Sequence, residues 1–547
     1  MSTLNLALGA HSTVLAEEAA QAGNPILNIS VFIAFIVVTM AVVLRAGKKT
    51  SEASDFYTGG ASFSGTQNGL AIAGDYLSAA SFLGIVGAVA LNGYDGFLYS
   101  IGFFVAWLVA LMLVAEPLRN TGKFTMADVL SFRLRQKPVR LAAAFGTLGV
   151  SLFYLIAQMA GAGSLVAVLL DIHDKTQQAF VVAVVGVIMI AYVLLGGMKG
   201  TTYVQMIKAV LLCSGVVIMA VLIFISVKGN FSQLLQNAVD AHNGNSDILK
   251  PGLKYGKTTT TKLDFLSLGL ALVFGVAGLP HVLMRFYTVP TAKEARKSVT
   301  WAIVLIGGFY LLTLVLGYGA AAMVGPDRIK GAPGGANAAA PLLALELAGP
   351  IFMAIISAVA FATVLAVVAG LAITASASVA HDIYHSIIRN GESTEEEQVR
   401  VSRITVVVIG VLAIILGILA MGQNVAFLVA LAFAIASSAN VPTILFSLYW
   451  RKFNTTGALA SMYTGLISAI VLIAFSPAVS GSKTAMFPDM DWHLFPLANP
   501  GIVSIPLAFL AGVIGTYLGK PDNFDDLQAE MEVRSYTGVG VEAPVAH

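Results

Sequence analysis

Long apolar stretches recur along this chain and restrict the folds that it can adopt. A helix needs about 20 mostly apolar residues to cross the hydrocarbon core of a bilayer. Thirteen stretches approach or exceed that length, near 26–44, 67–92, 96–115, 141–170, 177–198, 203–226, 263–285, 298–325, 347–380, 404–421, 424–450, 455–476 and 501–518. Only 11% of the 547 residues are charged, whereas soluble domains carry about 25%. We therefore predict an all-α, polytopic membrane protein of about thirteen transmembrane helices, forming one domain over residues 1–547.

Basic residues in the loops predict the orientation of the chain. The loop 116–140 holds six Lys and Arg residues and the loop 285–297 holds four. Both loops fall on one side of the predicted membrane, and cytoplasmic loops carry such an excess. We therefore expect the N-terminus outside and the polar tail 519–547 in the cytoplasm. The net charge of +2 gives no reason to expect a nucleic-acid partner, because the charges lie in loops between apolar spans.

Two blocks of five predicted helices form an inverted arrangement. Residues 67–226 and 263–450 each contain five stretches, and the two blocks begin on opposite sides of the membrane. Each block opens with a helix interrupted by glycine, and in the second block Pro280 also removes a backbone donor. Paired interrupted helices in two inverted halves are typical of a secondary-transporter site. The alternative is that Gly and Pro are simply common in membrane helices.

Asp75 lies inside the apolar stretch 67–92, which is otherwise uncharged. A carboxylate in the middle of a membrane helix costs about 2.5–3.5 kcal/mol on insertion scales, so it normally faces a cavity, a cation or a partner. We predict a functional role for Asp75, and the alternative is a structural role in an ion pair or hydrogen bond.

Five longer motifs resemble a known family. They are 66–84 (TQNGLAIAGDYLSAASFLG), 154–163 (YLIAQMAGAG), 278–287 (GLPHVLMRFY), 356–370 (ISAVAFATVLAVVAG) and 424–434 (NVAFLVALAFA). Over nearly its whole length the chain resembles the solute:sodium symporter family, and within it the cation/acetate branch and the actinobacterial monocarboxylate permeases. The resemblance implies a LeuT-type fold of 5+5 inverted repeats, with one helix added before the repeats and two after them. It also implies location in a bacterial plasma membrane and import of acetate, propionate and pyruvate.

The same resemblance implies a cation site with an irregular ligand set. The main-chain carbonyls of Gly74 and Leu77 are expected to bind sodium, with a one-residue offset around Asp75 also compatible with the match. The hydroxyl pair that completes the family's site falls on Ala366 and Val367, which have no side-chain oxygen.

Two coupling ions therefore remain open. Thr363 lies one helical turn before Ala366, so it could complete a sodium site. If the sodium site is incomplete, a proton is the coupling ion. Asp75 would then be its carrier, because burial favours the neutral form of a carboxyl group. No other cofactor is expected.

A short monocarboxylate has an anionic end and a small apolar end. The anionic end suits free N–H groups at a helix break. Candidate substrate residues are Tyr76, Ser78, Ser81, Gln158, Gly275 and Gly278. Gln158 is alternatively an interhelical hydrogen-bonding residue. Arg285 and Lys208 are expected to extend towards the cytoplasmic interface.

Other functions make different demands on the sequence. A family symporter for another small solute, such as proline or a sugar, is the first alternative. A membrane-embedded sensor or enzyme is the second. The sequence has no HExxH, CxxC or Walker motif, and we expect that the protein is not an enzyme.

Overall fold

The computed structural model of the protein describes residues 26, 28–31, 33–34, 37–38, 41, 61–122, 124–522 and 525–539, without the side chains of 195–199 and 525. In this part of the chain, eleven helices and one bent helix pair are long and apolar enough to cross a membrane. They correspond one by one to the predicted stretches from 67–92 to 501–518. The predicted stretch 26–44 lies largely outside the described residues.

The predicted first repeat begins with the interrupted helix. In chain order its elements are α4 (Gly65–Tyr76), the π-helix η2 (Ala80–Gly84), α5 (Ile85–Asn92), α6 (Tyr94–Leu113), α7 (Ala115–Thr121), α8 (Met126–Leu130), α9 (Gln136–Leu170) and α10 (Lys175–Ser226). The interrupted helix packs on α10 of the same repeat and on α14 (Ala292–Met323) of the second. The long α10 contains two spans, 175–194 and 200–226. The short α11 (Phe231–Ala241) and η3 (Ser246–Leu249) connect the two repeats.

The predicted second repeat, residues 263–450, is also helical throughout its spans. Its elements are α12 (Thr259–Gly278), α13 (Pro280–Met284), η4 (Arg285–Thr288), α14 (Ala292–Met323), α15 (Pro326–Gly331), η5 (Gly335–Ala338), α16 (Ala339–Ala377), η6 (Ser378–Ile388), α17 (Glu395–Leu419), α18 (Val425–Ala439) and α19 (Val441–Tyr449). Three helices follow it: α20 (Thr455–Ala474), α21 (Gly501–Leu518) and α22 (Asp525–Thr537).

Both predicted interruptions are present. α4 ends at Tyr76, and the helix formed by η2 and α5 leaves it at an angle of 59°. α12 ends at Gly278, and the chain is extended at Leu279 before α13 begins with Pro280. Since proline has no N–H, it cannot continue the hydrogen-bond ladder of α12. Each repeat therefore begins with a helix that exposes main-chain groups in its middle.

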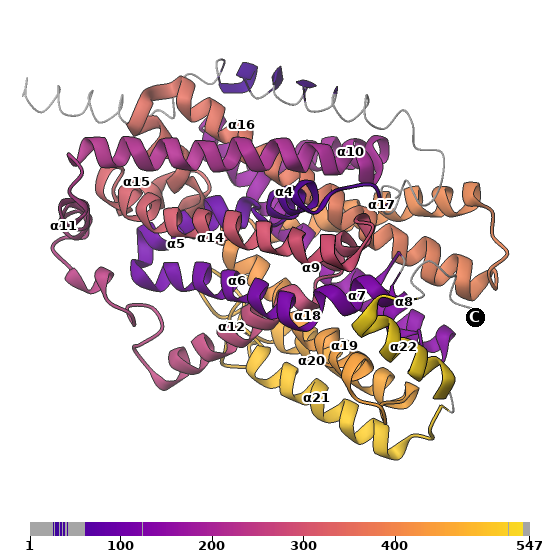
Figure 1. Ribbon diagram of the computed structural model, residues 1–547. Coiled ribbons are helices and arrows are strands. Elements are labelled where there is room, and N and C mark those ends of the chain that lie inside the picture. Colours follow the sequence, from indigo (N-terminus) through magenta and orange to yellow (C-terminus); the bar gives the residue numbers. More distant parts are fainter. Residues whose placement is uncertain are drawn as a thin grey trace, which may run out of the picture.

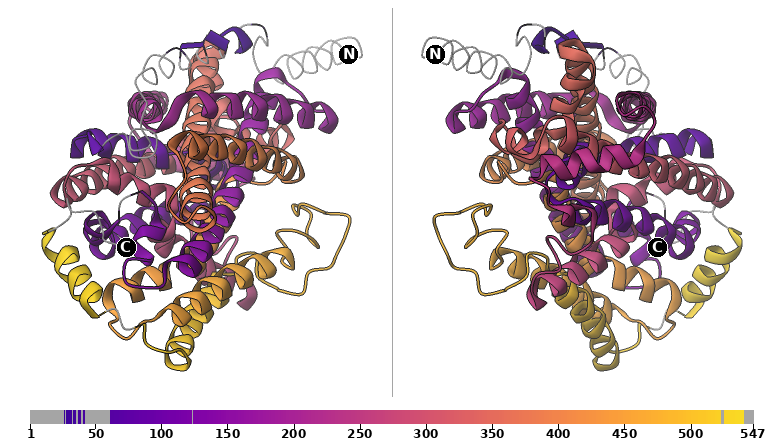
Figure 2. Two further views of the ribbon diagram at one scale, coloured as in Figure 1. Left: turned by 90° about the vertical axis from the view of Figure 1, so that its right-hand side faces the viewer. Right: turned by 90° about the vertical axis from the view of Figure 1, so that its left-hand side faces the viewer.

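The interrupted helices lie inside the bundle. Most residues of α4 and of the span that contains α12 and α13 are buried, as are most in the spans of α9, α16 and α18, whereas fewer than half of the span residues of α10, α14, α17, α20 and α21 are buried. Figure 1 shows α10 along one side and α21 along the opposite side, with α4, α9 and α18 between them. The connection between α20 and α21 projects from the body of the bundle (Figure 2).

The basic loops meet at one end of the bundle. Arg119 Nε donates a hydrogen bond to the Val289 carbonyl at 2.7 Å, and Arg296 forms an ion pair with Glu116. The loops 116–140 and 285–297 are therefore in contact, and we call this end of the molecule the basic end.

Candidate functional site

Asp75 is the centre of a buried polar network between the two repeats. It lies in the last turn of α4 and is 2% exposed. Its Oδ1 accepts a hydrogen bond from Gln205 Nε2 on α10 at 2.9 Å, and its Oδ2 lies 3.5 Å from Arg285 Nε on η4. Arg285 also donates to Thr202 Oγ1 at 2.8 Å and to the side-chain oxygen of Gln205. Three elements that are distant in sequence are thereby held together at the break.

The structure corrects the expectation for Arg285. Its side chain is 1% exposed and points into the network, so the expected extension to the membrane surface is wrong. The physical reason is the break in the helix, because α13 and η4 place Arg285 opposite Asp75 and Gln205. These side chains offer the guanidinium acceptors within the bundle, so it does not extend to the interface.

Lys208 is buried in the same way. It is 1% exposed, and its Nζ donates a hydrogen bond to the main-chain carbonyl of Thr363 on α16 at 2.9 Å. The expectation that Lys208 extends towards the interface is therefore also wrong. One turn further along α16, the Ala366 carbonyl lies 3.4 Å from Gln205 Nε2. Both carbonyls thus already have donors from α10.

Gly74 and Leu77, which are expected to offer carbonyls to a cation, flank Asp75 in the first break, and a role of these residues in cation binding stays a prediction. Gly74 packs so closely on α10 that an added Cβ would lie 2.0 Å from the Gln205 carbonyl oxygen. At Gly370 on α16 an added Cβ would lie 3.1 Å from Asp75 Oδ1. The Leu77 N–H bonds back to the Ala73 carbonyl, at the start of the break.

The hydroxyl half of the expected sodium site remains irregular. Ala366 and Val367 are fully buried and have no side-chain oxygen. Thr363 is also buried, and its Oγ1 donates to the Ala360 carbonyl at 2.6 Å. Beside it, the protein already places a nitrogen donor at the main chain of α16, the Nζ of Lys208.

Aromatic rings line the break on the side of α6, α14 and α18. The Tyr76 ring lies 5.0 Å from Trp107, 6.2 Å from Phe103 and 6.2 Å from Phe433, between ring centres. The Tyr76 hydroxyl donates to the Phe103 carbonyl at 2.9 Å. The break is therefore bordered by a rigid apolar wall.

The two candidate serines lie within the break and beside it. Ser78 Oγ accepts from the Ala80 N–H at 3.2 Å, and Ser81 Oγ lies 3.0 Å from the Tyr310 hydroxyl. Both serines are buried. Ser78 therefore contacts the first turn of the helix after the break, and Ser81 connects that helix to α14.

Gln158 and His281 are buried side chains in this region whose polar atoms all lack a hydrogen-bond partner among the described residues. Both amide atoms of Gln158 and both ring nitrogens of His281 are unpaired. Gln158 lies one helical turn after Tyr154 on α9, and the Tyr154 ring lies 5.3 Å from the His281 ring. Because buried polar groups in native proteins are normally hydrogen-bonded, such atoms mark a place where a ligand or water binds.

The glycines of the second break have a packing role. A Cβ at Gly275 would lie 2.2 Å from the Phe433 ring, and one at Gly278 would lie 2.4 Å from the Ala436 carbonyl oxygen. The Gly278 carbonyl accepts a hydrogen bond from Asn440 Nδ2 at 2.7 Å. Close packing of α12 on α18 thus explains these glycines, and their contact with a substrate stays a prediction.

A second ionic cluster lies at the basic end. Arg140 Nη1 donates to Asp128 and to Asp382 at 2.9 Å each, which joins α9 to α8 and η6. Burial alone would raise the pKa of Asp128, but Arg140 and His381 beside it hold that pKa well below the usual carboxyl range. Asp128, His381 and Asp382 have the spacing of metal ligands. The guanidinium of Arg140 already binds both carboxylates, so the cluster is explained as an ionic network that joins α8, α9 and η6.

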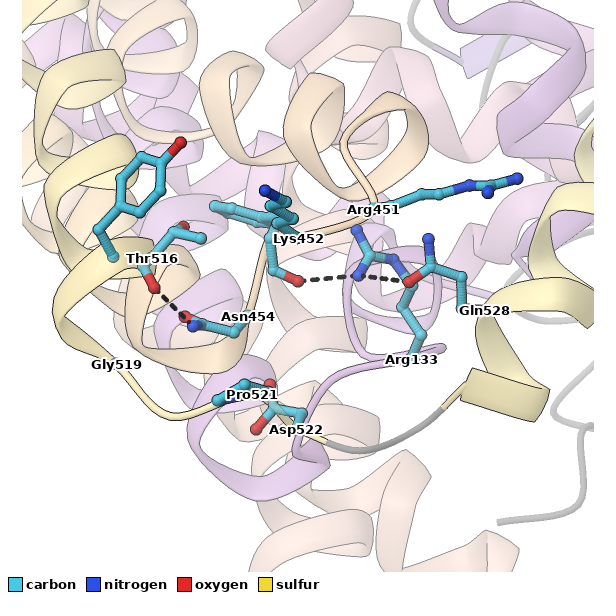
Figure 3. Close-up of a pocket in the computed structure, with 11 residues that line it drawn as sticks. Arg133, Arg451, Lys452, Asn454, Thr516, Gly519, Pro521, Asp522 and Gln528 are labelled. Carbon is cyan, nitrogen blue, oxygen red and sulfur yellow. Dashed lines mark hydrogen bonds between the residues drawn. The ribbon is translucent and has the colours of Figure 1, made fainter.

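A pocket of about 430 Å³ also opens at the basic end, away from the broken helices (Figure 3). Arg133 at its edge donates to the carbonyls of Phe453 and Trp450 at 2.8 Å and thus caps the end of α19. Asn454 donates to the Thr516 carbonyl at 2.9 Å, which ties α20 to α21. These contacts indicate a structural junction between helices.

The sequence pointed to part of this site. Asp75, Tyr76, Ser78 and Ser81 lie at the first break, and Gln158 is buried on α9. Four residues that complete the site were not predicted as members of it: Gln205, Lys208, His281 and Arg285. The sequence shows each of them as a polar residue inside an apolar stretch. Because they lie near the predicted ends of these stretches, a position at the membrane interface was the simpler interpretation.

Comparison with known proteins agrees with this architecture. The pattern of the sodium:solute symporter family matches residues 56–465. The chain is 76% identical to the monocarboxylic acid transporter of Corynebacterium glutamicum, over 98% of this chain and 100% of that protein. It is 50% identical to the uncharacterized symporter YwcA of Bacillus subtilis, over 94% of this chain and 100% of that protein.

A solved structure shares the fold. It is that of a Na+-coupled sialic acid symporter in a substrate-bound, outward-open state, with a TM-score of 0.68 and 16% identity over 90% of this chain and 98% of that one. The predicted LeuT-type, all-helical fold is thereby confirmed.

Proposed function

Since this chain belongs to the sodium:solute symporter family, we propose that it is a secondary active symporter that imports short-chain monocarboxylates such as acetate, propionate and pyruvate. Members of this family are transporters and not enzymes. The observation that carries the proposal is the pair Gln158 and His281. Their polar atoms are buried and unpaired among the described residues; the His281 ring lies 5.3 Å from the Tyr154 ring, and Gln158 follows Tyr154 by one helical turn. The 76% identity to a protein named monocarboxylic acid transporter supports the choice of substrate.

The chemistry of the centre suits a small anion with an apolar tail. The Gln158 amide is a donor that is able to bind a carboxylate oxygen, and His281 supplies a second donor from the other repeat. The rings of Tyr154 and Phe433, 6.3 Å apart, offer the tail an apolar surface. A substrate held between α9 and α13 would contact both repeats at once, which is what alternating access requires.

The Arg140 cluster supports the direction of transport. It joins three elements at the basic end, and cytoplasmic loops carry the excess of basic residues. We therefore place the basic end in the cytoplasm of a bacterial cell, with the N-terminus outside. The Arg140 cluster would then be closed when the substrate enters from outside and would open to release it.

The test is uptake by the purified protein in liposomes. Labelled acetate should accumulate inside when a proton or a sodium gradient is imposed, and unlabelled propionate and pyruvate should compete with it. Proline and glucose in equal excess should not compete. Absence of acetate uptake under both gradients, or competition by proline or glucose that equals that of propionate, would refute the proposed substrate class.

A further inference from the structure

The buried centre holds more basic than acidic side chains. Among its described residues, Lys208 and Arg285 are basic and Asp75 is the carboxyl group that faces them. The other buried carboxylates have partners at the two ends of the bundle. Asp95 accepts three main-chain N–H groups of the loop 252–255, and Asp382 is bound by Arg140. When Lys208 and Arg285 are both charged, the centre therefore carries one uncompensated positive charge.

Lys208 is the cation without a carboxylate partner. The described residues offer its Nζ one acceptor, the Thr363 carbonyl at 2.9 Å, although an ammonium has three N–H donors. Arg285, in contrast, has the carboxylate of Asp75 together with Thr202 and Gln205. A buried charge without a counter-charge is costly. When Lys208 is protonated, its ammonium is the charge of the centre that lacks a counter-charge.

The position of Lys208 is that of the expected coupling cation. Its ammonium binds the same stretch of α16, beside the first break, in which oxygen ligands for sodium are expected. Next to it, the Ala366 carbonyl is bound by Gln205, and Val367 has no side-chain oxygen. The chain thus places an amine, which binds a proton, where a sodium site would need oxygen atoms that are free.

We propose that Lys208 is the coupling residue of this transporter: its amine takes up a proton when the monocarboxylate binds and releases it to water on the other side of the membrane. This inference rests on the proposed function. In the step an N–H bond forms from a water-borne proton on the outside, and the same bond breaks towards water on the inside. It assigns to Lys208 the role that the sequence alone had suggested for Asp75.

Charge balance explains how such a residue couples two fluxes. With the substrate anion bound and Lys208 protonated, the two anions balance the two cations. With the substrate absent and Lys208 neutral, Asp75 balances Arg285. Both of these states are neutral, whereas anion alone or proton alone leaves one buried charge. The cost of a charge at the centre of a membrane would slow the change of conformation in these half-loaded states on the order of 100-fold.

The groups around Lys208 are consistent with this assignment. Asp75 on α4 and Arg285 on η4 are the charged groups that interact with it. His281 on α13 and Tyr154 on α9 interact with Asp75 in turn. Asp75 is bound through both oxygens by Arg285 and Gln205, which are partners suited to a carboxylate. Lys208 has a neutral carbonyl as its partner, so it is able to gain and lose a proton without breaking an ion pair.

Proton uptake on binding tests the proposal directly. Purified full-length protein in weakly buffered solution is mixed with acetate, and a pH indicator dye reports the protons taken up per acetate bound. Within the pH range of the lysine titration we expect the wild-type protein to take up to about one proton. The variant Lys208→Met should take up none, and its acetate affinity should not change with pH. Lys452→Met, at an exposed lysine beside the pocket of the basic end, should behave as the wild type.

A comparison of acetate exchange with net acetate accumulation distinguishes a variant that has lost coupling from one that has not folded. Arginine keeps its proton, so Lys208→Arg leaves the substrate-loaded centre neutral but the empty centre charged. Exchange of internal for external acetate requires the loaded state alone, whereas net accumulation also requires the empty return. In liposomes with a proton gradient, Lys208→Arg should therefore lose net accumulation on the order of 100-fold and lose far less of the exchange rate. If Lys208→Arg does not exchange, the comparison of the wild type with Lys208→Met in the dye experiment decides.

Three outcomes would overturn the inference. They are wild-type acetate binding without proton uptake, proton-driven accumulation by Lys208→Met at the wild-type level, and accumulation that needs a sodium gradient and ignores a proton gradient. In each of these cases acetate is still bound or transported, so the proposed function stands. A wild-type protein that neither binds nor transports acetate, propionate or pyruvate would instead refute the proposed function.

Discussion

The Asp75 carboxylate lies 3.5 Å from Nε of Arg285, which follows it by 210 residues. This ion pair joins α4 of the first repeat to η4 of the second, at the places where both opening helices are interrupted. An interrupted helix leaves main-chain groups without their helical partners and must be held by its neighbours. We infer that the pair stabilises the two breaks in one relative position.

Asp75→Asn should both destabilise the protein and abolish acetate accumulation. Removal of one partner of a buried ion pair leaves the other charge uncompensated and costs about 3–5 kcal/mol. The melting temperature of the purified protein in detergent measures the loss. The double variant Asp75→Asn/Arg285→Gln should recover part of that temperature, because no lone charge remains. A single variant with wild-type melting temperature and accumulation would show that the pair is dispensable.

Gln158→Leu should weaken acetate transport without loss of stability. Since the Gln158 amide has no partner among the described residues, its removal breaks no hydrogen bond of the protein. A lost hydrogen bond to a charged ligand group is worth about 1.5–3 kcal/mol, which predicts an increase in the KM for acetate of roughly 10- to 150-fold. Initial uptake rates and the melting temperature are both measured. Ser461→Ala, which removes an unpaired buried hydroxyl on α20, should change neither.

The contribution of Asp128 to stability should depend on pH in a defined direction. Its pKa in the folded protein lies below the usual carboxyl range. The ionised form therefore stabilises the fold at every pH above the unfolded pKa of about 3.9, and this contribution is lost as the pH falls further. Asp128→Asn should lower the melting temperature at pH 7, with a cost of about 1.5–3 kcal/mol. The difference from the wild type should shrink below about pH 4, and a difference that grows there would contradict the assignment.

Gly74→Ala should prevent correct assembly of the site. A Cβ at this position would lie 2.0 Å from the Gln205 main-chain oxygen, so α4 and α10 would have to separate. We expect low yield of folded protein and no acetate uptake, measured by size-exclusion chromatography and by transport. Gly308→Ala on α14 is the matched control, because a Cβ there meets no atom within 4 Å. It should be neutral or stabilising by up to about 1 kcal/mol.

The helices and their interruptions could be predicted because they depend on local properties. The length of an apolar stretch determines whether it crosses a bilayer, and Pro280 cannot donate the hydrogen bond that would continue α12. Asp75 could be singled out in the same way, since a lone carboxylate in a membrane helix requires a partner. The identity of that partner was not accessible, because Arg285 and Gln205 follow it by 210 and 130 residues.

The sequence by itself therefore determined that the chain is a bundle of membrane helices, two of which are interrupted. Hydrophobicity and the capacity to donate a backbone hydrogen bond are properties of each residue, so they can be recognised without the fold. Only the tertiary structure decided which polar groups face each other. Lys208 and Arg285 lie near the ends of apolar stretches. At such positions the sequence looks the same whether the side chain extends to the membrane interface or points into the bundle. The packing of α10 on α4 and α16 turned Lys208 towards the Thr363 carbonyl, and the break before α13 turned Arg285 towards Asp75.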